Sequence, residues 1–276
     1  IELYSVTGGV PKYIELFSES GDIYRAIQKC VLNRSGYLYD EPHFLLQQEV
    51  SEVGSYFSII KAIAAGNHKL STIAAVLEVK STNLTKYLKT LMDLDILERR
   101  VPVTEENPEK SKRGLYKIKD NYLRFWFAFI YPNMSFIESG HSGIVMDKIR
   151  KGLTTSHIGF VYEDICQERM WELNANNAWP FHFSKLGEYW DAKNEIDIAA
   201  LDPEGKNLIL GECKYWKEPV GLNVLHALEA KACDVAWERD RRKVWYVLFS
   251  ISGFSDELRN HAATRDDLLL IDDGER

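Results

Sequence analysis

Apolar residues between positions 51 and 119 recur first with the period of a helix and then with that of a strand. The helical stretches are 52–65, 71–77 and 81–94, and the strand-like stretches are 97–103 and 115–118. Short polar breaks separate the helices, and a polar loop joins the strands. Three helices followed by a hairpin predict a winged helix-turn-helix in residues 51–119.

The helix expected over 81–94 has one apolar and one polar face. Leu84, Leu88 and Leu91 recur at the spacing of a buried face, Tyr87 lies beside them, and Ser81 is a residue type that often N-caps helices. Winged modules place this third helix in the DNA major groove and the hairpin loop on the backbone. The residues that would contact nucleic acid are Asn83, Lys86, Lys89, Lys112 and Arg113. Such modules also serve as spacers or protein contacts, so both roles stay open.

The remaining pattern divides the chain into four segments. Residues 1–50 read as helical, with Pro11 suited to a first helical turn. Residues 120–132 carry too many aromatic side chains for a solvent-exposed linker, and we expect a helix packed between two halves of the chain. The predicted division is 1–50, 51–119, a connector at 120–155, and 156–276. The fold class is then a multidomain α+β or α/β protein.

Composition excludes several classes of protein. The 276 residues are 45% hydrophobic and 27% charged, which is ordinary for a folded chain. The longest apolar stretch, 125–131, is far too short to span a bilayer, and the first residues lack the pattern of a secretory signal. Four cysteines fall in no CxxC or zinc-like spacing. We therefore expect a cytoplasmic protein with reduced thiols and no membrane partner.

The net charge changes sign along the chain. The whole chain carries −7, whereas residues 51–119 hold twelve Lys or Arg against eight Asp or Glu, a net charge of +4. An overall acidic chain is not a uniformly basic nucleic-acid binder. Contact with phosphate is expected to begin in this segment.

From residue 156 the pattern predicts a helix, two strands, a helix and a strand. The two strands, 195–201 and 207–215, flank a turn rich in Pro and Gly, which favours a hairpin. If Leu201 pairs with Lys206, Asp197 becomes a diagonal neighbour of Glu212. Because side chains alternate along a strand, Asp197, Glu212 and Lys214 would share one face of the sheet.

Two neighbouring carboxylates repel each other unless a divalent cation or a lysine neutralises them. Magnesium, or manganese, is commonly held by one or two carboxylates together with water and substrate phosphate. A salt bridge between Lys214 and either carboxylate on a solvated sheet face is the simpler alternative. The scattered histidines form no cluster with cysteine, so zinc is not expected.

These residues resemble the signature of the PD-(D/E)xK nuclease superfamily, in which a helix glutamate precedes a strand aspartate and a Glu-x-Lys on the next strand. Glu195-Ile-Asp197 and Gly211-Glu-Cys-Lys214 match the strands, and the upstream Glu163 matches the helix residue. The resemblance implies that Asp197 and Glu212 bind the metal and that Glu163 assists. It also implies that Lys214 orients the attacking water and stabilises phosphate charge.

Over its whole length the chain resembles the C-terminal region of archaeal-type ATPases of the AAA+ class, which join a lid, a winged helix and a nuclease-like domain. Gly8-Gly-Val-Pro-Lys12 resembles the lid element, with Lys12 at the nucleotide-sensing position. The phosphate-cradling pattern G-x-x-x-x-G-K-[ST] does not occur in the sequence. The resemblance implies a longer protein whose ATPase core is missing from this chain, and no ATP hydrolysis by these residues alone.

The sequence thus favours a nucleic-acid-processing region with a DNA-binding winged helix and a metal-dependent phosphodiesterase domain. DNA is the expected substrate, and RNA, strandedness and a homo-oligomeric active unit stay open. The alternative is a non-catalytic regulatory region that binds DNA or another protein.

Overall fold

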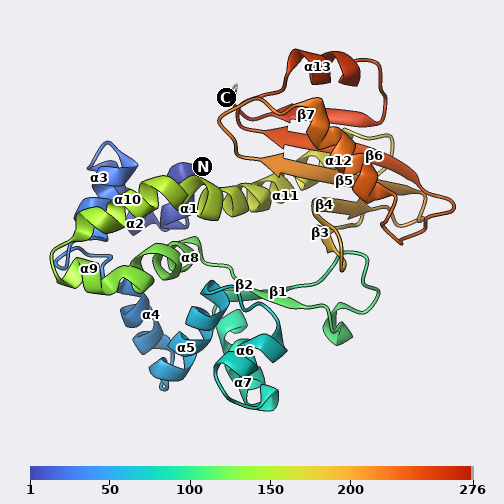
Figure 1. Cartoon of the computed structure of the whole chain (residues 1–276). Helices are drawn as coiled ribbons and strands as arrows, with labels where there is room; N and C mark the ends of the chain where they lie inside the picture. Colours follow the sequence, from blue (N-terminus) through green and yellow to red (C-terminus); the bar gives the residue numbers. More distant parts are fainter. Residues whose placement is uncertain (275–276) are drawn as a thin grey trace. The chain divides into compact units, whose positions relative to one another are not determined.

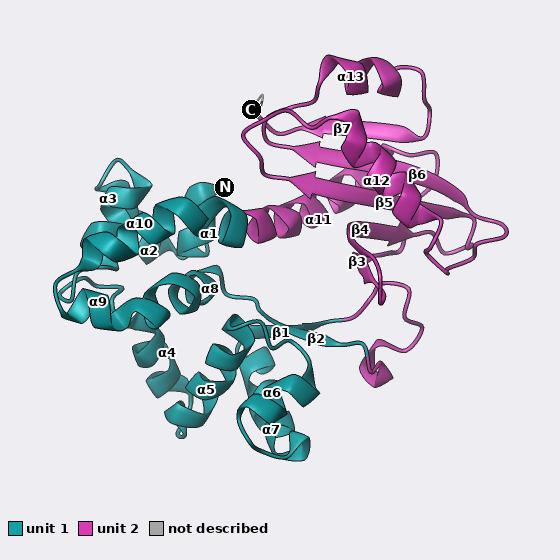
Figure 2. Cartoon of the chain, viewed as in Figure 1, with its two compact units in different colours: residues 1–100, 113–158 teal, residues 101–112, 159–276 magenta. Residues whose placement is uncertain are grey.

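The computed structural model describes residues 1–274, which form two compact units (Figure 2). Unit 1 contains Ile1–Arg100 and Arg113–Ile158, and unit 2 contains Val101–Lys112 and the chain from Gly159 onward. This division is coarser than the four segments expected from the sequence. The fold is a mixture of α and β structure (Figure 1). None of the helices within residues 1–274 is long and apolar enough to cross a membrane.

Unit 1 starts with four short helices, α1 (Glu2–Thr7), α2 (Pro11–Ser18), α3 (Ile23–Cys30) and α4 (Glu41–Glu49). Pro11 opens α2, as expected from its fixed φ and missing N–H. The side chain of Asp22 caps α3 by accepting the backbone N–H groups of Tyr24 and Arg25. Local sequence signals therefore set the start of α2 and α3.

Three helices and a hairpin follow, and these predicted elements are confirmed. They are α5 (Val53–Ala64), α6 (Leu70–Val76), α7 (Ser81–Asp93), β1 (Leu97–Arg100) and β2 (Leu115–Ile118). The strands pair antiparallel, with Leu97 opposite Ile118. Ser81 is wrong as an N-cap, because α7 begins at Ser81 itself and Lys80 precedes it without a side-chain cap.

Most of the loop between β1 and β2 belongs to a different compact unit from the two strands that it joins. Its residues Val101–Lys112 belong to unit 2, where the Val103 N–H donates to the Glu188 carbonyl at 2.9 Å. The sequence pattern of a hairpin predicts only local pairing, so it could not predict this long-range hydrogen bond. Lys112 accordingly lies in unit 2 and Arg113 in unit 1.

The aromatic segment predicted to lie between two halves is instead part of unit 1. It forms α8 (Asn121–Phe125) and continues as a π-helical turn, Trp126–Ile130. The Trp126 indole N–H donates to the Tyr39 carbonyl at 2.9 Å, and its ring lies 5.9 Å from that of Phe57. The segment is buried as its composition predicts, and these two partners lie in the loop before α4 and in α5 (Val53–Ala64). Helices α9 (Met134–Glu138) and α10 (Ser142–Leu153) complete the regular helices of unit 1.

Unit 2 contains a five-stranded mixed sheet in the order β3-β4-β5-β6-β7. The strands are β3 (Lys185–Trp190), β4 (Glu195–Leu201), β5 (Asn207–Lys214), β6 (Lys243–Ser250) and β7 (Leu268–Asp272). The first three are antiparallel neighbours, and β5, β6 and β7 run parallel. The predicted β4–β5 hairpin and the strand β6 are confirmed, whereas β3 and β7 were missed by the pattern.

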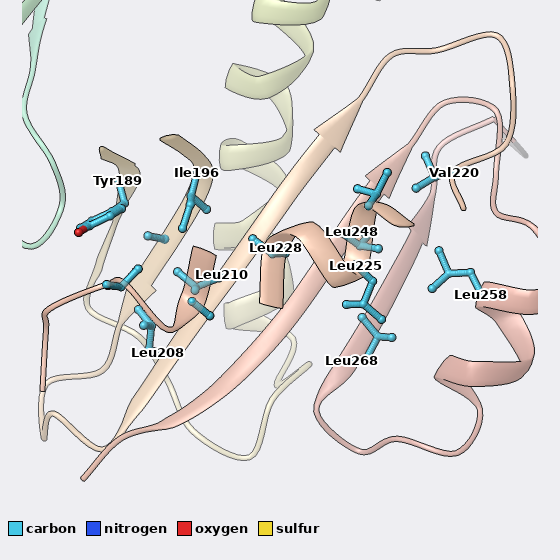
Figure 3. Close-up of a cluster of buried hydrophobic side chains, with 14 of the residues drawn as sticks. Tyr189, Ile196, Leu208, Leu210, Val220, Leu225, Leu228, Leu248, Leu258 and Leu268 are labelled. Carbon is cyan, nitrogen blue, oxygen red and sulfur yellow. The ribbon is translucent and has the colours of Figure 1, made fainter. Parts of the chain in front are cut away.

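Helices pack on both faces of this sheet. Side chains of α11 (Gly159–Ala175), including Cys166 and Met170, join one buried cluster with the sheet. Leu225 and Leu228 of α12 (Leu222–Ala232) join a second cluster with Leu208, Leu210 and strand residues of β6 and β7 (Figure 3). Helix α13 (Asp256–Ala262) adds Leu258 to this second cluster. The alternation of side chains along β5 therefore decides which of its residues face α12.

Candidate functional site

The β4–β5 hairpin has a register two residues away from the predicted one. Leu201 lies opposite Leu208, not opposite Lys206. The Asp202 carboxylate accepts the Lys206 N–H at 2.9 Å and the Asn207 side-chain amide at 2.7 Å, which closes a longer turn. Because the error is two residues, every side chain keeps its face of the sheet. The predicted convergence therefore survives the wrong register.

Asp197 lies just beyond the last paired residues of the hairpin, Ile198 and Gly211. Its Oδ2 accepts the backbone N–H of Cys213 at 2.9 Å, so a side chain replaces a backbone hydrogen bond there. The Asp197 carbonyl accepts the Gln167 side-chain amide of α11 at 3.1 Å. These two bonds hold the carboxyl at the point where the strands stop pairing.

Glu212 of β5 lies between two lysines. Its Oε2 accepts from the Lys214 Nζ and its Oε1 from the Lys231 Nζ, each at 2.5 Å. The Lys214 ammonium is also 3.7 Å from Asp197 Oδ2. The Glu212 side chain is only 7% exposed, so these charge pairs operate in a poorly solvated place. We call Asp197, Glu212, Lys214 and Lys231 the carboxylate–lysine cluster.

Lys231 was not among the residues predicted from the sequence. It comes from α12, which lies over the face of β5 that carries Glu212, and its Nζ also donates to the Glu195 carbonyl at 2.8 Å. Lys231 follows Val224 by seven residues and Leu228 by three, so it falls on the apolar face of the helix. A lysine on an apolar face is the signal that would have found it.

Burial and neighbouring charges together shift the pKa values of the cluster. Burial raises the pKa of Asp197, and the nearby Glu212 charge adds to this, bringing the pKa to about 6. Burial would also raise the pKa of Glu212, but Lys214 and Lys231 outweigh it and lower that pKa. For Lys214, burial favours a lower pKa, and the two carboxylates overcome it and raise the pKa. The lysines thus favour the charged form of Glu212, whereas burial and the Glu212 charge make Asp197 easier to protonate.

Glu163 comes from a different helix than Lys231. It lies on α11, one helical turn before Gln167, and α11 packs on the opposite face of the sheet from α12. Its charge adds to burial and to the neighbouring Cys166 in raising the pKa of the Cys213 thiol. Within residues 1–274, no three His, Cys, Asp or Glu side chains are arranged to hold a metal ion. Two carboxylates are therefore the donors that this face offers.

These donors fit magnesium or manganese by their chemistry. Both supply oxygen only, and the Asp197 Oδ2 that accepts the Cys213 N–H also lies 3.7 Å from the Lys214 ammonium. A like-charged pair whose mutual repulsion raises one pKa is a pair that a divalent cation would stabilise. Magnesium held by two carboxylates keeps water and takes substrate phosphate as further ligands.

The predicted nucleic-acid contacts fall in both units. Asn83, Lys86 and Lys89 are exposed along α7, where Lys89 forms an ion pair with Asp93 at 3.6 Å. Lys112 is exposed in the loop of unit 2, whereas Arg113 of unit 1 is half-buried. The structure thus places three of the five on one helix face.

The predicted nucleotide-sensing residue lies in unit 1. Lys12 is in the first turn of α2 and pairs with Glu15 at 2.9 Å, with 51% of its side chain exposed. An exposed pair of this kind is weak and is easily exchanged for another anion. Its proposed role depends on a nucleotide site outside this chain.

Comparison with known proteins gives a family match without a biochemical activity. Residues 126–232 match the model of the DUF234 family, described as archaeal and bacterial proteins of unknown function. The chain is also 37% identical over 218 residues to an uncharacterized protein of Methanocaldococcus jannaschii, covering 79% of this chain and 48% of that protein. The chain thus spans about half the length of this relative. All four residues of the carboxylate–lysine cluster lie inside the family match.

Proposed function

We propose that unit 2 is a metal-dependent phosphodiesterase of the PD-(D/E)xK type that acts on nucleic acid. The observation that supports this proposal is the convergence of Asp197, Glu212 and Lys214 from two adjacent strands into one poorly solvated cluster. A helix on each sheet face and the mixed strand order agree with such a fold. The order of the residues along the chain is that of the nuclease signature.

Each residue of the cluster has a role in this proposal. Asp197 and Glu212 would hold magnesium or manganese, which when bound polarises a phosphoryl oxygen and lowers the pKa of a water molecule. Lys214, charged and anchored between both carboxylates, would orient the attacking water and stabilise charge developing on phosphate. Glu212 is held by both lysines, so its carboxylate is positioned before substrate arrives.

We further propose that residues 51–119 form a winged helix whose α7 face binds nucleic acid, in a protein that includes an ATPase. The chain would then be the C-terminal part of that protein, with Lys12 completing a nucleotide site in the missing core. The basic excess of this segment and the exposed polar face of α7 support the first part. The lid-like sequence around Lys12 and the length of the relative support the second.

One observation favours the non-catalytic alternative. Both oxygens of Glu212 are engaged by lysine ammonium groups, so the cluster is electrically balanced without a metal. A cluster of this kind could serve only to stabilise the fold. The two functions differ in whether a divalent cation enters the cluster and whether a phosphodiester bond is then cut.

A cleavage assay tests the proposed activity. The chain is incubated with labelled single-stranded and duplex DNA and RNA in magnesium, in manganese, or in excess EDTA. We expect cutting with either metal and none in EDTA, because the carboxylates must hold a cation to act. Intact substrates under all conditions, in a preparation shown to be folded, would favour the non-catalytic function.

The α7 face has its own test. Replacing Lys86 and Lys89 by glutamine should weaken duplex binding, and each lost phosphate contact should reduce the slope of log affinity against log salt by about 0.9. The control is Lys206→Gln, because Lys206 is an exposed lysine in a turn of unit 2. An unchanged slope in the double variant, measured by fluorescence anisotropy over a salt series, would show that this face does not bind phosphate.

A further inference from the structure

An exposed tryptophan lies next to the carboxylate–lysine cluster. Trp216 follows β5 by two residues, and the residue is 48% exposed. The Lys214 Nζ lies 5.7 Å from the centre of a Trp216 ring, so indole and cluster are in direct proximity. The Trp216 carbonyl accepts the Ser252 hydroxyl at 2.5 Å, which ties the backbone of this residue to the end of β6.

Trp216 is more exposed than the aromatic residue before it, Tyr215. The ring of Tyr215 packs at 5.5 Å against that of Tyr162 on α11, and Tyr215 is half-buried. Trp216 is exposed, as are the two positions that follow it, Lys217 and Glu218. Burying an indole contributes more than burying most side chains, so the exposed part of this one, beside the Lys214 ammonium that lies over its ring, offers binding surface.

We propose that Trp216 is a stacking platform for an unpaired nucleobase of the substrate. Any base can stack on an indole, but the faces of bases inside a duplex are already covered by their neighbours. A base on Trp216 would bring its attached phosphate toward the ammonium of Lys214. This inference rests on the proposed function and specifies its substrate class, which is nucleic acid with single-stranded or frayed nucleotides at the cut.

The test compares Trp216→Ala and Trp216→Phe with wild type, using a fluorescent single strand and the matching duplex. Binding is measured by anisotropy in EDTA, which prevents cutting, and the cleavage kcat/KM is measured in magnesium. Trp171→Ala is the matched control, because Trp171 is 46% exposed on α11 of the same unit. Thermal melts of all variants establish that they are folded.

We expect Trp216→Ala to bind the single strand about 5- to 150-fold more weakly, with Trp216→Phe retaining most of the affinity. Duplex binding and the Trp171→Ala variant should change little. The inference is overturned if wild type does not bind single strands, if Trp216→Ala binds them as wild type does, or if it loses single-strand and duplex affinity equally.

The two proposals fail in different ways. If wild type binds single strands through Trp216 and cuts nothing with metal, the phosphodiesterase proposal falls and the stacking platform stands. If wild type cuts with metal and Trp216→Ala cuts single strands with unchanged kcat/KM, the platform falls and the phosphodiesterase stands.

Discussion

We expect Asp197→Asn to reduce metal-dependent cleavage by about 100-fold or more while leaving the fold intact. The amide keeps the size of the carboxyl, and its oxygen can still accept the Cys213 N–H that Asp197 Oδ2 accepts. What the variant loses is the negative charge that a hard cation requires. Its removal also relieves the repulsion with Glu212 that contributes to the raised pKa of Asp197, so no loss of folding free energy is expected from that source.

Glu212→Gln should lose cleavage to a similar extent, with a larger effect on stability. Two lysines face this side chain at 2.5 Å, and a neutral amide leaves their charges without their nearest anion. The two variants thus distinguish the roles of the two carboxylates. Both should reduce cleavage, and only Glu212→Gln is expected to lower the stability of the fold.

Titration calorimetry with magnesium and manganese measures the loss directly. Asp266→Asn is the matched control, because Asp266 lies in an exposed pair with Lys243 in the same unit, where its side chain is 87% exposed. This control should bind metal and cut as wild type does. Equal metal binding by wild type, Asp197→Asn and Glu212→Gln would show that the carboxylates are not the metal ligands.

The second large effect is expected from Lys231→Met, which should lower the free energy of unfolding of unit 2 by about 2 kcal/mol at neutral pH. Methionine keeps an unbranched side chain of similar length, but Glu212 Oε1 loses its charged donor in a place that is 7% exposed. Lys214 remains on the other oxygen, which keeps the loss below that of an entirely unpaired buried charge.

Urea unfolding with and without magnesium measures this effect and its reversal. Removing an ammonium makes the cluster more negative, so we expect magnesium to stabilise Lys231→Met more than it stabilises wild type. Lys206→Met is the control, because the ion pair of Lys206 with Glu204 is well exposed and contributes little to stability. Equal stability of Lys231→Met and wild type without metal would mean that the Lys231 contact does not stabilise Glu212.

The period of side-chain alternation was enough to predict most of the site. Asp197, Glu212 and Lys214 lie on one sheet face in the structure as in the prediction, although the hairpin pairs Leu201 with Leu208. The face of a strand residue depends only on whether its position is odd or even, so a two-residue error leaves it unchanged. The register itself depends on the Asp202 side chain closing the turn, which the pattern of apolar residues does not contain.

Contacts between distant parts of the chain had to come from the structure. Lys231 enters the cluster only because α12 packs over β5, and Glu163 comes from α11, which packs on the other face of the sheet. The aromatic segment around Trp126 was predicted to be buried, since its composition requires that, but the pattern did not identify its partners, which include Tyr39 and Phe57. Local sequence thus determined the helices of residues 51–119, the β4–β5 hairpin, β6 and the faces of their side chains, which follow from backbone periods, whereas β3 and β7 were missed. Tertiary packing decided which helix covers which face of the sheet. The sequence pattern could not show this, because the free energy of burial depends on the apolar area removed from water and not on which partner covers it.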